Sequence, residues 1–257
     1  MNKILVKRLL QKPTAWPACA KVVVAIVMRR KEVVIRRQGV KLRAKIGSGQ
    51  GLYCAVAGTS YEPEMSYFLN RMQPGDTFID VGANIGNFSL HACRRIQPTG
   101  KVYSFEPLQE TFKDLQANIQ LNGAQNIEAF KIALSDKKGS FTMKVPSRNS
   151  SAILVQSKGE VITETLDGFC ARNHISEPQF IKVDIEGGEL DFFHGAQQVL
   201  QRSAPLILFE SMHSGPKYPE RSFLREIGFE LYRFTGLGME VLSDDSSWSG
   251  NVLALKV

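Results

Sequence analysis

The stretch FIDVGANIGNF, residues 78–88, decides the fold of this chain of 257 residues. Its apolar beginning is typical of a buried strand, and the strand ends close to an acid, Asp80. Gly82 and Gly86 follow, which is typical of a tight turn between a strand and a helix. The stretch therefore predicts a nucleotide-binding turn, and the residues around the two glycines predict which nucleotide it takes.

The spacing of the glycines disfavours a dinucleotide. The pattern GxGxxG needs a second glycine where the backbone approaches a pyrophosphate, but this chain has Asn84 there and Asn87 at the third glycine position. No GK[ST] sequence follows, so a P-loop is excluded as well. Asp80 adds negative charge at the mouth of the strand. The turn thus favours a ligand that has positive charge and no phosphate, such as S-adenosylmethionine.

Strand and helix patterns alternate from residue 77 onward, with short connections between them. The main expected strands are 77–81, 102–105, 127–132, 180–183 and 205–210, and the main expected helices are 84–95, 109–122 and 189–201. Such alternation predicts a parallel sheet covered by helices on both faces. Ligands of these sheets bind at the carboxyl ends of the strands, so the residues after each strand are the candidates for chemistry.

Several polar side chains follow the expected strands. Glu106 comes after the second strand and 24 residues after Gly82. This is near the ~20-residue offset at which an acid binds ribose hydroxyls in related sheets. The segment IALSD (132–136) is expected to end the third strand, with Ser135 beside an adenine. The fourth and fifth strands are followed by Asp184, Glu186, Glu210 and His213.

Seven motifs occur in a characteristic order and spacing. They are YEPE (61–64), PGDTFIDVGANIGNFS (74–89), VYSFEP (102–107), NIQLNG (118–123), ALSD (133–136), TLDGF (165–169) and IKVDIEGGELDFFHGA (181–196). Together they resemble the FkbM family of methyltransferases over roughly residues 58–212. Single motifs are shared by many methyltransferases, whereas the set, and KVDIEGGE in particular, is specific to this family.

The resemblance implies an α/β fold of the class I methyltransferase (Rossmann-like) type, with a mostly parallel seven-stranded sheet and helices on both faces. It implies S-adenosylmethionine as the cofactor and hydroxyl groups of sugars, glycolipids or natural products as acceptors. Asn87 departs from the family, which often has an aromatic residue at this position. Carried over by position, the cofactor contacts are Glu62, Asp80, Gly82, Ala83, Asn84, Gly86, Asn87, Glu106, Ser135 and Asp184.

Methyl transfer to an alcohol is an in-line displacement, and a base that removes the hydroxyl proton assists it. The candidate bases are Asp184, Glu186, Glu210 and His213, and Asp184 leads because it directly ends the strand expected to face the sulfonium. Two other roles stay open: Asp184 could bind the ammonium group of the donor, and Glu186 could cap the next helix. Asp184, Glu210 and His213 could instead hold Mg²⁺, although no metal ligands are assigned.

The basic residues gather in the first 45 positions, which carry thirteen Lys or Arg and one acid, Glu32. The remaining chain holds 19 basic and 24 acidic residues, so the net charge of +7 comes from this segment. Residues 1–57 are expected to form a basic extension of helix and short strands, with Gly39 in a turn, before a catalytic domain at 58–257. The charge predicts an anionic contact, and a membrane surface, a nucleic acid and an acidic substrate all fit.

Within this extension, the β-branched run KVVVAIVMRR (21–30) predicts a strand. Residues 1–12 predict a short basic helix that lies on a membrane or packs on the domain. No apolar run approaches the roughly 20 residues of a spanning helix. The expected strands leave room for pairing between subunits, so the sequence is compatible with a homo-oligomer.

Four scattered cysteines without a CxxC pair predict neither a disulfide framework nor a zinc site, and a reducing, cytoplasmic location fits them. Two other functions fit parts of the sequence. A nucleic-acid methyltransferase would use the basic extension. However, the fourth strand ends in VDIEG rather than in the NPPY-type turn that grips a flipped base, so nucleic acid is not expected as a partner. A non-catalytic nucleotide-binding module would leave the complete set of cofactor-end residues unexplained.

Overall fold

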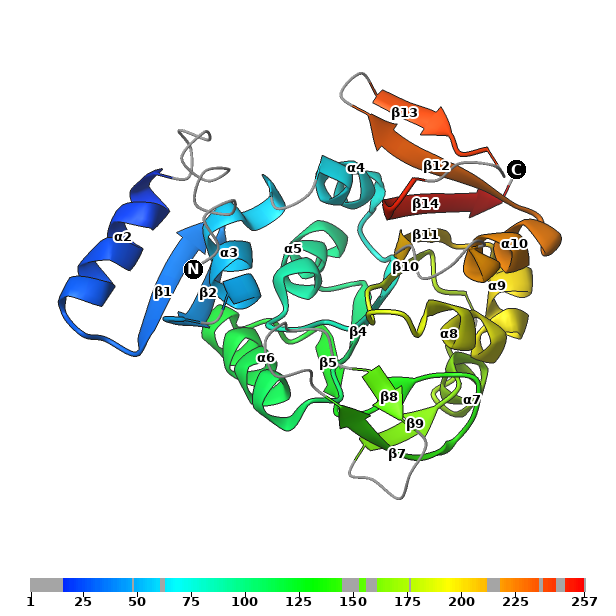
Figure 1. Ribbon diagram of the computed structural model, residues 1–257, viewed down its shortest axis with the longest axis horizontal. Helices are drawn as coiled ribbons and strands as arrows, with labels where there is room; N and C mark the ends of the chain where they lie inside the picture. Colours follow the sequence, from blue (N-terminus) through cyan, green and yellow to red (C-terminus); the bar gives the residue numbers. More distant parts are fainter. Residues whose placement is uncertain are drawn as a thin grey trace.

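A central eight-stranded sheet organises the molecule from residue 77 to the end of the chain (Figure 1). Its strand order is β13-β12-β14-β11-β10-β3-β4-β5. Five neighbouring strands are parallel: β3 (Thr77–Val81), β4 (Lys101–Phe105), β5 (Ile127–Phe130), β10 (Phe180–Val183) and β11 (Leu206–Ser211). Three antiparallel strands extend the β11 side: β14 (Gly250–Lys256), β12 (Phe229–Thr235) and β13 (Gly238–Val241). The expected mostly parallel class I sheet is confirmed, and β13 adds an eighth strand at its edge.

The computed structural model describes residues 16–47, 49–60, 63–144, 153–155, 161–175, 177–211, 218–235, 238–243 and 248–256. Among these residues, no helix combines the length and the apolar character that crossing a membrane requires. The expected helix at residues 1–12 lies outside the described residues.

Helices cover both faces of the sheet because successive strand residues point to opposite sides. Phe78 of β3 enters one hydrophobic core, and its neighbours Ile79 and Val81 enter the other. The first core is shared with α4 (Pro63–Arg71) and α5 (Asn87–Ile96). The second is shared with α7 (Leu166–Arg172), α8 (Glu189–Gly195), α9 (Gln197–Ser203) and α10 (Pro219–Glu226).

A second sheet holds the segment that follows β5. Its order is β6-β9-β7-β8, made of β6 (Ala133–Leu134), β9 (Val161–Glu164), β7 (Gly139–Lys144) and β8 (Ile153–Val155). The prediction that IALSD ends the third parallel strand is therefore wrong. That strand stops at Phe130, and Ala133–Leu134 pairs with β9 instead. The short strands between the helices carry too little pattern for the sequence to distinguish one long strand from two.

The N-terminal extension contains more helix than the sequence predicts. The run at 21–30 was expected to be a strand, but α2 spans Trp16–Val27. Its buried residues Ala18, Val22 and Ala25 are spaced by four and three, so they form one helical stripe. The helix propensity of valine is only slightly reduced, and packing of this stripe decides the structure. A second helix, α3 (Gly49–Ala57), also lies in the region where short strands were expected, and a short 3-10 helix, η2 (Gly58–Ser60), follows it.

The expected hairpin of the extension is present. Strands β1 (Glu32–Arg37) and β2 (Val40–Lys45) pair antiparallel. Gln38 and Gly39 connect them with positive φ angles of 43° and 82°, the combination found in tight two-residue hairpin turns. Ile35 and Leu42 of this hairpin belong to the same core as Phe78. The hairpin is thus packed directly on the helices and strands around β3.

Two asparagines of α6 (Gln109–Asn122) attach strand β2 to the rest of the molecule. Asn118 accepts a hydrogen bond from the Arg43 N–H at 2.8 Å and donates to the carbonyls of Arg43 and Ile85, at 3.2 and 3.0 Å. One helical turn later, Asn122 accepts a hydrogen bond from the Lys41 N–H at 2.8 Å and donates to the Lys41 carbonyl at 2.6 Å. Asn118 is fully buried, and it joins the hairpin to the turn that follows β3.

We expect Asn118→Ala to lower the free energy of unfolding by about 2–4 kcal/mol, because it leaves buried backbone groups of Arg43 and Ile85 without partners. Asn122→Ala is the matched control, since it removes the equivalent bonds at a more exposed position and is expected to cost less than about 1 kcal/mol. Urea denaturation of the two variants checks the difference. Equal losses would contradict the special role of Asn118.

Candidate functional site

The turn between β3 and α5 brings the ends of two parallel strands into close contact. Gly82 has a φ angle of 76°, and a Cβ atom at this position would lie 2.0 Å from the backbone oxygen of Asp184. No side chain fits such a contact. Gly86, at the start of α5, has a φ angle of 90° and also favours glycine. The glycine at 82 therefore serves strand packing directly, and it sets the site between β3 and β10.

The backbone N–H groups of this turn are already engaged within the protein. Gly82 and Ala83 donate to the Phe105 carbonyl, Asn84 to Glu106 Oε2, Ile85 to Asn84 Oδ1 and Gly86 to the Ala83 carbonyl, all at 2.8–3.0 Å. Phosphate-binding turns present such groups to the ligand. This turn offers no N–H group to a phosphate, so it does not suit a dinucleotide or a P-loop nucleotide.

A buried ion-pair array lies beneath the turn. Asp80 is completely buried and accepts a 2.5 Å hydrogen bond from the Ser89 hydroxyl. Lys182 is its neighbour on β10, with Nζ 3.7 Å from Asp80 Oδ1 and 3.1 Å from Asp184 Oδ2. The same Nζ donates to the Gly82 carbonyl at 3.1 Å. Burial raises the pKa of Asp80, and the charge of Lys182 opposes that rise. Asp80 thus lies below the surface of the turn and is 0% exposed, so the direct cofactor contact that the sequence predicts for it is not available in this structure.

Glu106 connects the end of β4 to the glycine turn. Its two oxygens accept hydrogen bonds from the N–H groups of Asn84 and Leu108, both at 3.0 Å. Burial raises the pKa of Glu106 to about 7, although these two hydrogen bonds and Lys182 act in the opposite direction. Each carboxylate oxygen keeps a second lone pair, so Glu106 can still accept a bond from a ligand hydroxyl.

Three carboxylates meet at the ends of β10 and β11. Asp184, Glu186 and Glu210 each offer an oxygen, and these oxygens lie within 4.8 Å of one another. All three side chains are half-buried. Glu186 has a φ angle of 55°, a strained conformation that accumulates at functional sites. The group can attract a positive charge, accept a proton or ligate a divalent cation through oxygen.

Two of the other predicted residues, Ser135 and Asn87, are buried. Ser135 is 4% exposed, donates to Asp136 Oδ1 at 3.2 Å, and packs so tightly that a Cβ at Gly195 would lie 2.0 Å from its carbonyl oxygen. Asn87 is 6% exposed and donates to the Gly58 carbonyl at 3.4 Å. Two further candidates, Glu62 and His213, lie outside the described residues.

Lys182 and Glu189 are not among the residues that the motifs predict. Both belong to the segment KVDIEGGE, and an ionisable residue in a buried strand is the signal that could have identified Lys182. Glu189 is 6% exposed and accepts a hydrogen bond from the Ile185 N–H at 3.3 Å. Burial raises the pKa of Glu189 to about 7, and the nearby charge of Asp184 adds to the rise.

A second polar network closes the β11 side of the site. Arg221 is 2% exposed and lies with its guanidinium 3.5 Å from the centre of the Tyr218 ring. It donates to the Ser211 hydroxyl at 2.7 Å and to the Trp248 carbonyl at 2.5 Å. The Ser211 hydroxyl in turn donates to Glu220 at 2.5 Å. This network fixes the segments of two aromatic residues, Tyr218 and Trp248, near the end of β11.

We expect Lys182→Met to lower the free energy of unfolding at neutral pH by about 3–5 kcal/mol, because Asp80 would remain buried without its cation. Adding Asp80→Asn to this variant should recover most of the loss, since the uncompensated charge is then gone. Urea denaturation of the two single variants and the double variant checks the coupling. A loss below about 1 kcal/mol for Lys182→Met would mean that the ion pair is not needed.

The pKa of Glu189 predicts a pH-dependent stability. A folded-state pKa of about 7, above the ordinary value of 4.5, means that the neutral carboxyl is favoured in the folded protein. The stabilisation that the neutral carboxyl gives to the folded protein is complete below the pKa that Glu189 has in the unfolded chain. It is lost as the pH rises through 7. Because glutamine does not ionise, the free energy of unfolding of Glu189→Gln should rise relative to that of the wild type, by on the order of 2 kcal/mol, as the pH increases from about 5 to about 8. Thermal or urea unfolding at several pH values measures this; parallel pH profiles would contradict it.

Comparison with known proteins connects this geometry to a family. The methyltransferase FkbM domain matches residues 80–231, more than half of the chain. The chain is 28% identical over 150 residues to the hexuronic acid methyltransferase AglP of Haloferax volcanii, and the match covers 57% of this chain and 60% of that protein. It is 27% identical over 148 residues to methyltransferase 1 of Beauveria bassiana, covering 48% and 59%. The matches thus span about three fifths of these curated relatives.

Among solved structures, a methyltransferase FkbM from Methylobacillus flagellatus aligns with a TM-score of 0.49 at 18% identity, over 82% of this chain and 55% of that chain. The domain match carries the assignment, because it includes the glycine turn, Glu106 and the carboxylates after β10 in one continuous region. The protein belongs to the FkbM family of methyltransferases, and its methyl donor is S-adenosylmethionine.

Proposed function

We propose that this protein transfers the methyl group of S-adenosylmethionine to a hydroxyl oxygen of a sugar or of a sugar-containing acceptor. The observation that carries the proposal is the meeting of Asp184, Glu186 and Glu210, whose oxygens lie within 4.8 Å of one another. An alcohol is a weak nucleophile until its proton is removed, and a carboxylate within hydrogen-bond reach can accept that proton. Three carboxylates beside the donor site are therefore suited to methyl transfer to oxygen.

The residues of the site fit the donor, which supplies an electrophilic methyl group on a positively charged sulfur when it is bound. The N–H groups of residues 82–86 are engaged within the protein, so the turn does not attract a phosphate. Asp184 and Glu186 bring negative charge to the same edge of the sheet. Glu106, fixed by two backbone N–H groups, has lone pairs for the ribose hydroxyls.

Among the three carboxylates, we assign the base role to Asp184. Lys182 contacts its Oδ2 at 3.1 Å, which fixes the orientation of the carboxylate. Oδ1 is then the oxygen that takes the proton from the acceptor hydroxyl. Glu186 and Glu210 would hold the acceptor by accepting hydrogen bonds from its other hydroxyl groups. A base positioned in this way contributes roughly 10²–10⁴-fold to the rate.

The choice of a sugar as acceptor rests on two supports. The relative AglP carries the name hexuronic acid methyltransferase, and its match extends over 150 residues, 57% of this chain. Arg221, which contacts the Ser211 hydroxyl at the end of β11, also holds the segments of two aromatic residues, Tyr218 and Trp248. Rings of this kind combine an apolar face with a polar edge, which suits a ligand that has both apolar and hydroxyl-bearing surfaces.

We expect Asp184→Asn to lower kcat for methylation of a sugar acceptor by about 10²–10⁴-fold while the affinity for S-adenosylmethionine changes less than about tenfold. The measurement combines calorimetric titration with the donor and turnover assays on a panel of monosaccharides, oligosaccharides and glycolipids. Glu186→Gln and Glu210→Gln should mainly raise KM for the acceptor. Glu177→Gln is the matched control, because this exposed acid precedes β10 at the opposite end of the sheet.

Three outcomes would contradict the proposal. Turnover by Asp184→Asn at the wild-type rate would remove the base assignment. Methyl transfer to RNA or DNA and to no sugar would replace the acceptor class. Tight binding of NADH, with no binding of S-adenosylmethionine, would overturn the electrostatic interpretation of the glycine turn.

A further inference from the structure

Helix α2 exposes large apolar side chains on the face opposite its buried stripe. Ala18, Val22 and Ala25 are buried against the hairpin and the core. The residues on the other side of the helix are large and exposed, namely Trp16 at 58%, Val23 at 58%, Val24 at 53% and Val27 at 77%. Six of the nine exposed large hydrophobic residues in the described part of the chain lie between Trp16 and Met28. An exposed apolar patch of this kind marks an interaction site.

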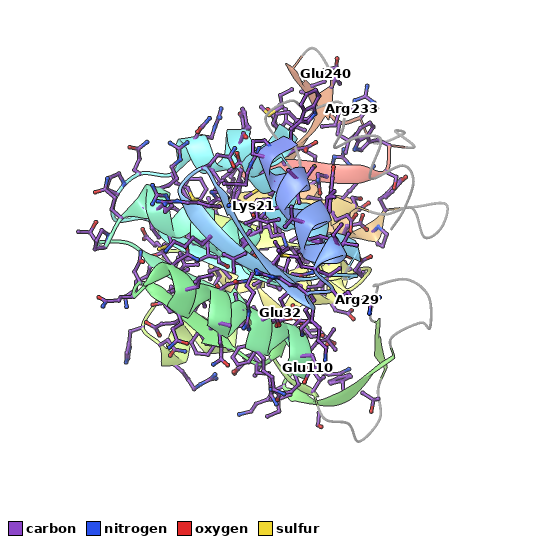
Figure 2. The ribbon with its side chains drawn as sticks, turned by 90° about the vertical axis from the view of Figure 1, so that its left-hand side faces the viewer. Lys21, Arg29, Glu32, Glu110, Arg233 and Glu240 are labelled. Atoms are coloured by element: carbon purple, nitrogen blue, oxygen red, sulfur yellow. The ribbon has the colours of Figure 1, made fainter. Side chains whose placement is uncertain are left out.

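Basic residues border this face. Lys21, Arg29, Arg30 and Lys31 are all exposed, and none of them forms an ion pair with the described residues. Figure 2 shows α2 on the face turned toward the viewer, with Lys21 beside the helix and Arg29 at its end. We call the exposed face of α2 together with these four cations the α2 surface.

The acids near the α2 surface are engaged elsewhere. Glu32 lies 3.6 Å from Arg43, and Glu110 lies 2.8 Å from Lys113. The four basic residues of the α2 surface therefore add up as an uncompensated positive field around an apolar centre. Arg29–Lys31 follow the C-terminus of α2, where positive charges interact favourably with the helix dipole. That effect does not explain Lys21 or the apolar residues between the cations.

We infer that the α2 surface docks on the anionic surface of a lipid bilayer. An interfacial helix places its apolar side chains at the boundary between headgroups and acyl chains, and its cations bind the lipid phosphates. The 12 residues of α2 span only about 18 Å, so the helix lies along the interface. Tryptophan, present here as Trp16, is favoured at this depth.

The shape and the charge of the α2 surface favour a bilayer over a protein partner. The surface is the convex side of one helix, and a fluid bilayer accommodates it without a complementary groove. A second copy of this chain would bring two identical basic borders together in a symmetric interface, and like charges placed opposite each other oppose association. Anionic lipid headgroups instead complement all four cations at once.

The test is flotation of the full chain with vesicles of phosphatidylcholine alone and of phosphatidylcholine mixed with phosphatidylglycerol. We expect the wild type to float at least about tenfold more with the anionic vesicles, because each basic residue near the surface contributes about fivefold in binding. Added salt should weaken the binding. Lys21→Gln combined with Arg29→Gln, Arg30→Gln and Lys31→Gln should remove the preference for anionic vesicles.

Val23→Glu combined with Val27→Glu should reduce vesicle binding at least about tenfold, since both side chains are exposed in the folded protein. The matched control is Ile162→Glu combined with Val241→Glu, which changes exposed hydrophobic residues elsewhere and should bind like the wild type. Circular dichroism and donor titration establish that all variants are folded.

Three results would overturn the inference. Flotation of the wild type with neither kind of vesicle would reject bilayer docking. Equal losses for Val23→Glu with Val27→Glu and for the control pair, Ile162→Glu with Val241→Glu, would mean that the effect is not specific to α2. A lipid-free dimer that Val23→Glu with Val27→Glu converts to a monomer, without vesicle binding by the wild type, would assign the surface to a second copy.

Discussion

Lys182 and Asp80 lie side by side on neighbouring parallel strands, and the site is arranged around this buried ion pair. The lysine also reaches Asp184 and the Gly82 carbonyl, so one cation links the acid under the turn, the turn itself and the acid at the strand end. A buried charge is costly unless it is paired. The requirement to keep Asp80 compensated therefore fixes the relative position of β3 and β10, and the rest of the site follows from it.

The fold and much of the site could be predicted from the sequence, because both depend on patterns that act over short distances. The helix at 109–122 was predicted with its observed bounds, and β3 and β10 likewise, since each is a periodic helix or a short, mostly apolar strand ended by a turn. Asp184, Glu186 and Glu210 were expected together because parallel strands end at one edge of a sheet, and the structure brings them within 4.8 Å.

What the sequence could not reveal depends on tertiary packing. The valines of 22–27 favour a strand by propensity, yet a buried stripe of small residues makes them a helix. IALSD looks like the end of a parallel strand, but it pairs with β9, which follows in the chain after a connection of more than 20 residues. The role of Lys182 appears only when the register places it beside Asp80. Each case requires knowledge of which distant residue is the neighbour.

The hydrogen bonds inside the glycine turn have a consequence for turnover. Because residues 82–86 satisfy their own N–H groups, the turn needs no ligand to hold its shape, and binding costs little ordering of the chain. The choice of ligand at this edge of the sheet then depends on the charge of the ligand more than on a closing movement of the turn. Once the methyl group has left, the sulfur of the spent donor is a neutral thioether. The acidic edge then attracts the product less than the donor, because only the ammonium group keeps its positive charge, and this favours exchange of product for a fresh donor molecule.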